Sequence, residues 1–299
     1  MSATILTGRL RARVSRLEQR PRAGRPRARA RWLVLAAMCV VAGLVAAPLI
    51  LMALIAFKSD GAYLADGPLS IPRPPTLANI VEYMDLVDFW QKLGNSIAIS
   101  LGVAIGASLL SLLSAYAIGV GRIRGRRGIL TVFLVANIIP QESLIYPLFT
   151  GVQHLGPLQS TIVPVTVILV VLQAAFGTYL IASVLSDFPR ALLEAAELDG
   201  AGKWRILWSV VFPVVRPTVA VLFVLMFIWS WNEFFIPFVL LTSGDVQTVP
   251  IALASLQGDR FLDPTATAAG AFISLLPTLI FFLVFQRTLV RGVAVGAVK

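Results

Sequence analysis

Polar side chains inside apolar stretches are the residues of this sequence best suited to contact a small molecule. Glu142 and Glu233 each lie in a long apolar run. A charged group there costs about 2.5–3.5 kcal/mol unless water, a partner or an interface stabilises it. Carboxylates and amides bond hydroxyl groups while aromatic rings cover C–H surface, which suits a polyhydroxylated ligand. The candidate solute-contacting residues are Asn137, Gln141, Glu142, Tyr146, Gln173, Trp231, Asn232 and Glu233.

The same residues allow two other interpretations. Gln173 and Asn232 could join helices through hydrogen bonds, and Trp231 could belong to an aromatic belt at a membrane surface. Alternatively, Glu142 and Glu233 could be proton or sodium sites of a secondary transporter driven by an ion gradient. This second alternative predicts transport without an ATPase and a pH-dependent loss of transport when either glutamate becomes glutamine.

The sequence offers little to a catalytic mechanism. Cys39 is the only cysteine and His154 the only histidine, so neither an internal disulfide nor a metal-ligand cluster is apparent. A phosphate-binding loop needs Gly-Lys followed by Ser or Thr, with a second glycine five residues before the Gly-Lys pair. The only Gly-Lys pair, Gly202-Lys203, lacks both features. We therefore expect a non-catalytic chain that binds no metal and no cofactor. An integral membrane enzyme is a third interpretation, after a solute pathway and an ion-driven transporter, and these residues do not support it.

The composition predicts an all-α integral membrane protein. Hydrophobic residues make up 58% of the chain and charged residues 13%, with a mean hydropathy of +0.85, whereas soluble domains carry about 25% charged residues. The apolar residues form runs long enough to cross a bilayer as helices. The first run is too long for the apolar region of a cleaved signal peptide. The six predicted transmembrane helices are residues 32–57, 95–119, 129–149, 160–185, 217–241 and 266–285.

Two features inside these spans predict local geometry. Gly102 and Gly106 form a pair of small residues four apart, which lets helix backbones approach closely in lipid. Pro140 could bend the third span and expose backbone carbonyls.

Basic residues predict the orientation of the chain. Residues 1–31, 122–127, 190–216 and 287–299 hold ten, four, four and three Lys and Arg. Because such residues stay on the cytoplasmic side, both termini are predicted to be cytoplasmic. The position of the Arg-rich tail favours anionic membrane lipid over nucleic acid as the partner of its charge.

These observations divide the chain into five parts. Residues 1–31 form a cytoplasmic tail and residues 32–57 the first transmembrane helix. The remaining parts are an outer loop (58–94), a five-helix core (95–286) that includes a cytoplasmic loop (187–213), and a C-terminal cytoplasmic tail (287–299).

The loop between the fourth and fifth predicted spans carries a spaced motif. Its composition favours a short amphipathic helix that Gly200 ends. Small side chains would let a partner surface approach closely, and Glu194 could pair with a basic group there. A plain helical hairpin with a helix-breaking glycine is the alternative. The motif consists of Glu194-Ala195-Ala196, Gly200, Val210, Phe212 and Pro213.

This motif resembles the EAA loop of importer-type ATP-binding-cassette (ABC) permeases, with Val and Phe where the family more often has Ile and Leu. The resemblance extends from about residue 95 to the C-terminus. Residues 229–235, 248–250 and 285–299 are similar to the carbohydrate-importing branch, typified by the second permease of the maltose importer. The resemblance implies the importer-type permease fold with a cytoplasmic coupling helix.

The resemblance also implies an assembly and a function. The chain would form half of the pathway for a sugar or sugar-like solute. Its partners would be a second permease, two ATPase subunits that hold ATP and Mg²⁺, and an extracytoplasmic solute-binding protein facing residues 242–264. The implied ATPase-coupling residues are Glu194, Ala195, Ala196, Asp199, Gly200 and Lys203, with Val295, Gly296 and Lys299 as tail contacts.

Overall fold

The computed structural model describes residues 28–121, 123–242, 244–259 and 263–297. Every regular element in these ranges is a helix or a helical turn, which confirms the all-α prediction. The chain divides into two compact units, Met1–Leu51 and Met52–Lys299. The second unit carries the candidate site.

The first long helix is α2 (Ala28–Ala56). Its large apolar side chains between Trp32 and Ile50 are mostly exposed. A helix that is apolar on all sides is typical of a membrane-embedded segment. The predicted span of residues 32–57 therefore corresponds closely to α2.

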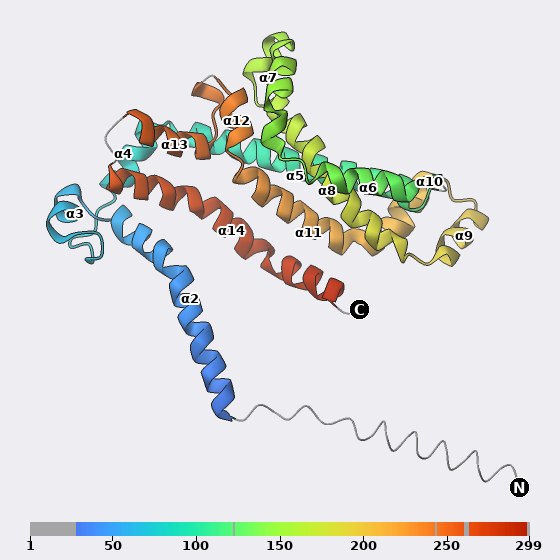
Figure 1. Cartoon of the computed structure of the whole chain (residues 1–299), viewed down its shortest axis with the longest axis horizontal. Coiled ribbons are helices and arrows are strands. Elements are labelled where there is room, and N and C mark those ends of the chain that lie inside the picture. The colour runs from blue at the N-terminus through green and yellow to red at the C-terminus, as the bar shows by residue number, and fades with distance from the viewer. Residues whose placement is uncertain (1–27, 122, 243, 260–262, 298–299) are drawn as a thin grey trace, which may run out of the picture. The chain divides into compact units, whose positions relative to one another are not determined.

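The second unit is built on long helices that run side by side (Figure 1). They are α5 (Phe89–Gly119), α8 (Val163–Ser186), α11 (Phe212–Trp231) and α14 (Pro264–Ala297). Helix α5 packs against both α8 and α11, and α11 also packs against α14. Buried aliphatic side chains from α5, α8 and α11 form the main core.

The small-residue pair of α5 packs against α8. A Cβ atom at Gly102 would lie 2.9 Å from Thr166 Cγ2, and one at Gly106 would lie 2.8 Å from Val170 Cγ2. Both contacts repeat after four residues on each helix. The glycines therefore act as a helix-packing surface, as their spacing predicts.

The third predicted span is broken. Helix α6 (Arg126–Ala136) ends near Asn137, and the chain resumes with the 3₁₀ turn η1 (Gln141–Leu144) and α7 (Ile145–Gln153) after a 90° bend. Pro140 lies between the two pieces, where it has no backbone N–H to continue the helix. The described chain thus has five helices long and apolar enough to cross a membrane, or six if the bent pair counts as one span.

The fifth predicted span is displaced toward the N-terminus. Helix α10 (Lys203–Ile206), the π-helical turn η3 (Leu207–Val211) and α11 form one apolar helical segment that ends at Trp231, not at residue 241. A separate short helix, α12 (Phe235–Leu240), follows. The second half of the predicted 187–213 loop is therefore already helical.

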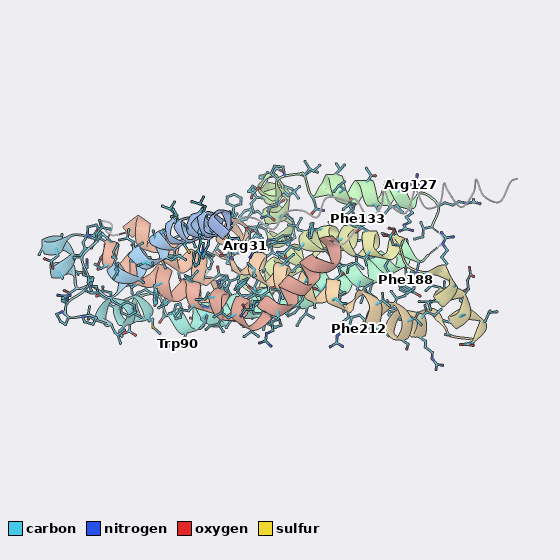
Figure 2. All side chains as sticks on the ribbon, turned by 90° about the horizontal axis from the view of Figure 1, so that it is seen from below. Arg31, Trp90, Arg127, Phe133, Phe188 and Phe212 are labelled. Carbon is cyan, nitrogen blue, oxygen red and sulfur yellow. The ribbon has the colours of Figure 1, made fainter. Side chains whose placement is uncertain are left out.

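Short elements gather at the two ends of the long helices (Figure 1). Helices α3 (Asp60–Asp66), α4 (Ala78–Leu86) and α13 (Val249–Asp259) lie at one end, and α9 (Arg190–Leu198) and α10 lie at the other. Figure 2 likewise shows Trp90 at the α4 end and Phe188 and Phe212 toward the α9 end. The helical loop and the segment of residues 58–94 are thus on opposite sides of the unit.

The segment of residues 58–94 is held by buried polar contacts. Lys58 is fully buried, and its Nζ donates to the Gly67 carbonyl at 2.6 Å and to Ser70 Oγ at 2.8 Å. Asn79 Nδ2 donates to the Lys58 carbonyl at 2.7 Å. Because these donors are satisfied by nearby acceptors, the segment is an ordered cap that contains α3, α4 and the first turn of α5.

Candidate functional site

Helix α9 carries the EAA-type motif and has a defined beginning and end. Pro189 precedes its first residue, a position where proline costs no hydrogen bond. At its end, Gly200 adopts a left-handed conformation with φ +75°. The N–H of Ala201 donates to the Ala196 carbonyl at 2.9 Å, and the N–H of Gly200 donates to the Glu197 carbonyl at 3.0 Å. This is a Schellman motif, which satisfies carbonyls that the helix end would otherwise leave free.

The two faces of α9 differ in burial. Leu193 and Ala196 pack against the main core. Leu192 and Ala195 point away from it and are exposed, and Leu198 is 89% exposed. Glu194 is exposed as well. The helix therefore sits on the unit by one apolar edge and presents a second apolar edge, flanked by a carboxylate, to its surroundings.

The segment that follows α9 is tied to helix α5. The Tyr116 hydroxyl of α5 donates to the Lys203 carbonyl at 2.9 Å, just after α9. A pocket of about 320 Å³ lies between α9 and the ends of α5 and α8, and its charged lining is Arg126, Arg190, Glu194 and Glu197. Residues of α9 and of the ends of α5 and α8 thus face one another across this pocket.

The predicted coupling residues occupy three places. Glu194, Ala195 and Ala196 lie on α9, and Asp199 and Gly200 lie in its C-terminal turn. Lys203 is exposed at the start of α10. Of the tail residues, Val295 and Gly296 lie on the α14 backbone with undescribed side chains, and Lys299 lies outside the described residues.

Two helix breaks meet where the sequence predicts solute contacts. Gln141 Nε2, at the break between α6 and α7, donates to Glu233 Oε2 at 2.8 Å. Glu233 lies at the break between α11 and α12, and its Oε1 accepts the backbone N–H of Ile236 at 3.2 Å. The glutamate thus caps α12 and joins the two breaks. The structure brings together two residues that are 92 positions apart in the sequence.

Two further predicted residues are used within their own helices. Asn137 Nδ2 donates to the Phe133 carbonyl, and Asn232 Nδ2 donates to the Ile228 carbonyl, each at 2.7 Å. Both asparagines are exposed at the C-terminal end of a helix. Each of these carbonyls also accepts the backbone N–H of the same asparagine, so the side-chain amide adds a second hydrogen bond to the last turn.

The remaining candidates do not form one cluster with Gln141 and Glu233. Tyr146 is 77% exposed and Glu142 is also exposed. Trp231 is 3% exposed and stacks on Phe227 with ring centroids 6.1 Å apart, so it belongs to the core rather than to an open surface. Gln173 is half-buried, and its Oε1 has no hydrogen-bond partner among the described residues.

Sequence reasoning missed polar residues at the far end of α7. Gln153, Gln159 and Ser160 line a small hollow there together with Thr242, which follows α12. The signal in the sequence was weak because these residues stand in two separate connecting segments. Only the packing of α7 against α12 brings them together.

The described residues thus form long apolar helices around a shared core, two helix breaks joined by a part-buried hydrogen bond, and a short amphipathic helix at one end. This arrangement is typical of a membrane permease. The chain belongs to the family of binding-protein-dependent transport system inner membrane components, whose model matches residues 107–295. It is a permease subunit of an ABC importer and thus a transport component rather than a catalyst.

Several relatives match nearly the whole chain. An arabinooligosaccharides transport system permease protein of Halalkalibacterium halodurans is 30% identical over 271 residues, covering 90% of this chain and 96% of the relative. A galactooligosaccharides transport system permease protein of Bacillus subtilis is 29% identical, covering 90% and 94%. A diacetylchitobiose uptake system permease protein of Streptomyces coelicolor is 27% identical, covering 90% and 96%.

A solved structure shares the fold. A chain of a bacterial ABC transporter involved in the import of the acidic polysaccharide alginate matches with a TM-score of 0.75 and 22% identity, over 88% of this chain and 98% of that chain. The same class of transporter has been solved with a periplasmic protein bound to an alginate pentasaccharide, with a TM-score of 0.61, 19% identity, and coverage of 87% and 96%.

Proposed function

We propose that this chain forms one half of the membrane pathway for a saccharide or a sugar-like solute, and that α9 couples the pathway to ATPase subunits. The solute class is supported by relatives named for oligosaccharides. A relative named for sn-glycerol-3-phosphate transport extends the class to sugar-like solutes. The proposal places the chain in a bacterial inner membrane with both termini, α9 and α10 on the cytoplasmic side.

The observation that carries the coupling proposal is the geometry of α9. Its inner edge, Leu193 and Ala196, is fixed to the core, while Leu192, Ala195 and Leu198 are free to enter a partner's groove. Burying three such apolar side chains would contribute a few kcal/mol to docking, since each buried CH₂ contributes about 0.8 kcal/mol. Glu194 would add a charge-assisted hydrogen bond to a basic group of the ATPase.

The coupling would be mechanical. ATP and Mg²⁺ would bind to two partner ATPase subunits, whose closure would draw α9 with it. The Tyr116 hydroxyl of α5 bonds the Lys203 carbonyl at the start of α10, which follows α9. Motion of α9 would reach α5 through this segment, and the long helices would rotate as a rigid group and open the pathway on the other side. A second permease subunit would supply the other half of the pathway, and a solute-binding protein would deliver the solute from outside.

Within the proposed pathway, the hydrogen bond between Gln141 and Glu233 holds the two helix breaks together. Helix breaks joined by a side-chain hydrogen bond resemble the discontinuous helices that form solute sites in other transporters. Glu233 uses one carboxylate oxygen for Gln141 and the other for the Ile236 N–H. We propose that this carboxylate positions α7 and α12 rather than carrying an ion, so the gradient-driven alternative is not favoured.

Reconstitution tests the proposed function directly. The chain is purified gently from its native membrane with its associated subunits, placed in vesicles with the solute-binding protein, and supplied with labelled lactose, trehalose or diacetylchitobiose. We expect ATP-driven uptake of at least one saccharide and co-purification of an ATPase and a second permease. Uptake by the chain alone under an ion gradient, without an ATPase, would support the rejected alternative instead.

A further inference from the structure

A hollow of about 190 Å³ lies where the end of α7, the following turn η2 (Gly156–Ser160) and the end of α12 meet. Its polar lining consists of Gln153, Gln159, Ser160 and Thr242, beside the ring of Phe149 and the buried Val152. The lining contains no Asp, Glu, Lys, Arg or His. A neutral ligand rather than an ion therefore suits the hollow.

The four polar side chains of the hollow are exposed, so a ligand could replace the water that bonds them. None of these four side chains forms a hydrogen bond with another residue in the described part of the chain. Each amide offers two donors and an acceptor, and each hydroxyl offers one donor and accepts as well. Phe149 adds a flat apolar surface at the same place. Such a set matches a ring that carries several hydroxyl groups around a C–H face.

The hollow is connected to the pathway through two helices. Helices α7 and α12 pack together, the contact between Gln141 and Glu233 joins their beginnings, and the hollow lies where both end. A nine-residue helix such as α7 is roughly 13 Å long at 1.5 Å per residue. The hollow thus lies at the other end of α7 from the helix break that contains Gln141.

We infer that this hollow is a saccharide subsite, in which Gln153, Gln159, Ser160 and Thr242 bond the hydroxyl groups of one sugar ring that lies against Phe149. Its volume is below the roughly 300–1,000 Å³ of pockets that enclose drug-sized ligands. It therefore holds a single ring, the rest of an oligosaccharide remaining outside. The inference rests on the proposed function and adds a place where the solute is held before it passes the two helix breaks.

The single cysteine of the chain permits a direct test. With Cys39 replaced by serine, Gln153→Cys and Gln159→Cys each place one thiol in the hollow. Gln91→Cys is the matched control, because Gln91 is an exposed glutamine outside the hollow. The full importer carrying each variant is labelled with a maleimide in the presence of lactose, trehalose or diacetylchitobiose, or of glycine betaine, which has no hydroxyl groups.

We expect a transported saccharide to slow labelling at residues 153 and 159 about threefold when its concentration is twice its Kd. Labelling at residue 91 is expected to stay unchanged, and glycine betaine to have no effect. Unprotected thiols in an importer that still takes up the same saccharide would overturn the subsite and leave the proposed function standing. Protection without ATP-driven uptake would support the subsite and contradict the coupling. Labelling blocked by the second permease whether or not sugar is present would assign the hollow to a subunit interface and overturn the inference.

Discussion

Gly200 is the residue whose backbone conformation matters most for α9. Its φ of +75° lies in the left-handed region, and no atom lies within 4 Å of the position that a Cβ would occupy. A side chain at this position would therefore meet open space but an unfavourable backbone, at a cost of about 1–2 kcal/mol. Gly202, two residues later, has equally open surroundings and a φ of −69°.

Replacing Gly200 by alanine should reduce coupling without preventing membrane insertion. A cost of about 1–2 kcal/mol lowers the ratio of the ordered to the disordered state of the C-terminal turn of α9 by roughly 5–30-fold. We expect a severalfold decrease in uptake and in transport-coupled ATPase activity in reconstituted vesicles. Gly202→Ala should behave as the natural chain, and Gly200→Asn should retain more activity because asparagine tolerates this conformation. Equal uptake by the Gly200→Ala and Gly202→Ala variants would refute the role of the turn.

Tyr83 is a buried residue on α4, at the opposite end of the unit. Its side chain is fully buried between α4 and α14, close to Gly270. Burial raises its pKa to about 12, and the nearby Ser274 hydroxyl offsets this only in part. Ser274 donates to the Gly270 carbonyl at 2.6 Å, and the Tyr83 hydroxyl forms no hydrogen bond with a described residue.

Stability should fall at high pH because of this tyrosine. The unfolded chain loses the phenol proton near pH 10, while the folded chain keeps it until about pH 12. Between these values the unfolded state binds fewer protons, so about 2–3 kcal/mol of the free energy of unfolding is lost as pH rises. Tyr83→Phe should remove this part of the pH dependence and leave stability at pH 7 nearly unchanged. Thermal unfolding at pH 8 and pH 11 measures both effects, and identical pH dependence in the two proteins would contradict the account.

At the scale of elements, the crossing of α5, α8 and α11 depends on one glycine. A Cβ atom at Gly177 of α8 would lie 2.2 Å from Ser111 Oγ and 2.6 Å from Met226 Cε. Ser111 Oγ also donates to the Ala174 carbonyl at 3.2 Å, one turn before this glycine. The three helices therefore approach closely because α8 has no side chain at this position.

Gly177→Ala should destabilise the helix core. Overpacking of this kind costs about 1–3 kcal/mol, since Ser111 and Met226 must move. The matched control is Gly94→Ala on α5, where nothing lies within 4 Å of the added atom. Thermal unfolding in detergent should show a lower Tm for the first variant and an unchanged or slightly higher Tm for the second. A Tm for Gly177→Ala equal to that of the natural chain would contradict this prediction, because the helix crossing would then accommodate the added methyl group.

The sequence predicts where the long helices lie, but it predicts the breaks between helices only in part. Hydropathy located all the long helices, because apolar runs are visible in composition alone. It extended the fifth span to residue 241, since residues 235–241 are as apolar as those before them. The separate start of α12 involves the hydrogen bond from the Ile236 N–H to Glu233, a local contact that hydropathy does not include. Pro140 did indicate a bend, but not its 90° angle.

At the scale of the whole molecule, the sequence predicts local structure better than it predicts contacts between distant residues. Glu194 and Gly200 are only six positions apart, so the helix and the turn at Gly200 follow from neighbouring residues. The pathway residues are far apart in the sequence, and only tertiary packing decides that Gln141 meets Glu233 while Trp231 turns into the core. Local signals thus predict α9 and its C-terminal turn, whereas the contact between Gln141 and Glu233 requires the structure.

The central claim is that the exposed edge of α9 is held by an ATPase subunit. In a chain whose Cys39 is replaced by serine, Ala195→Cys places a single thiol on that edge, and Ala78→Cys places one on α4 at the other end. Both alanines are exposed on nine-residue helices, so their thiols are matched in accessibility.

Cross-linking from this thiol to nearby amines, in membranes that contain the whole importer, is the most direct measurement. The account predicts a product between Ala195→Cys and an ATPase subunit, with a yield that changes when ATP is added, and no such product from Ala78→Cys. An importer that still takes up saccharide while Ala195→Cys captures no ATPase would contradict it.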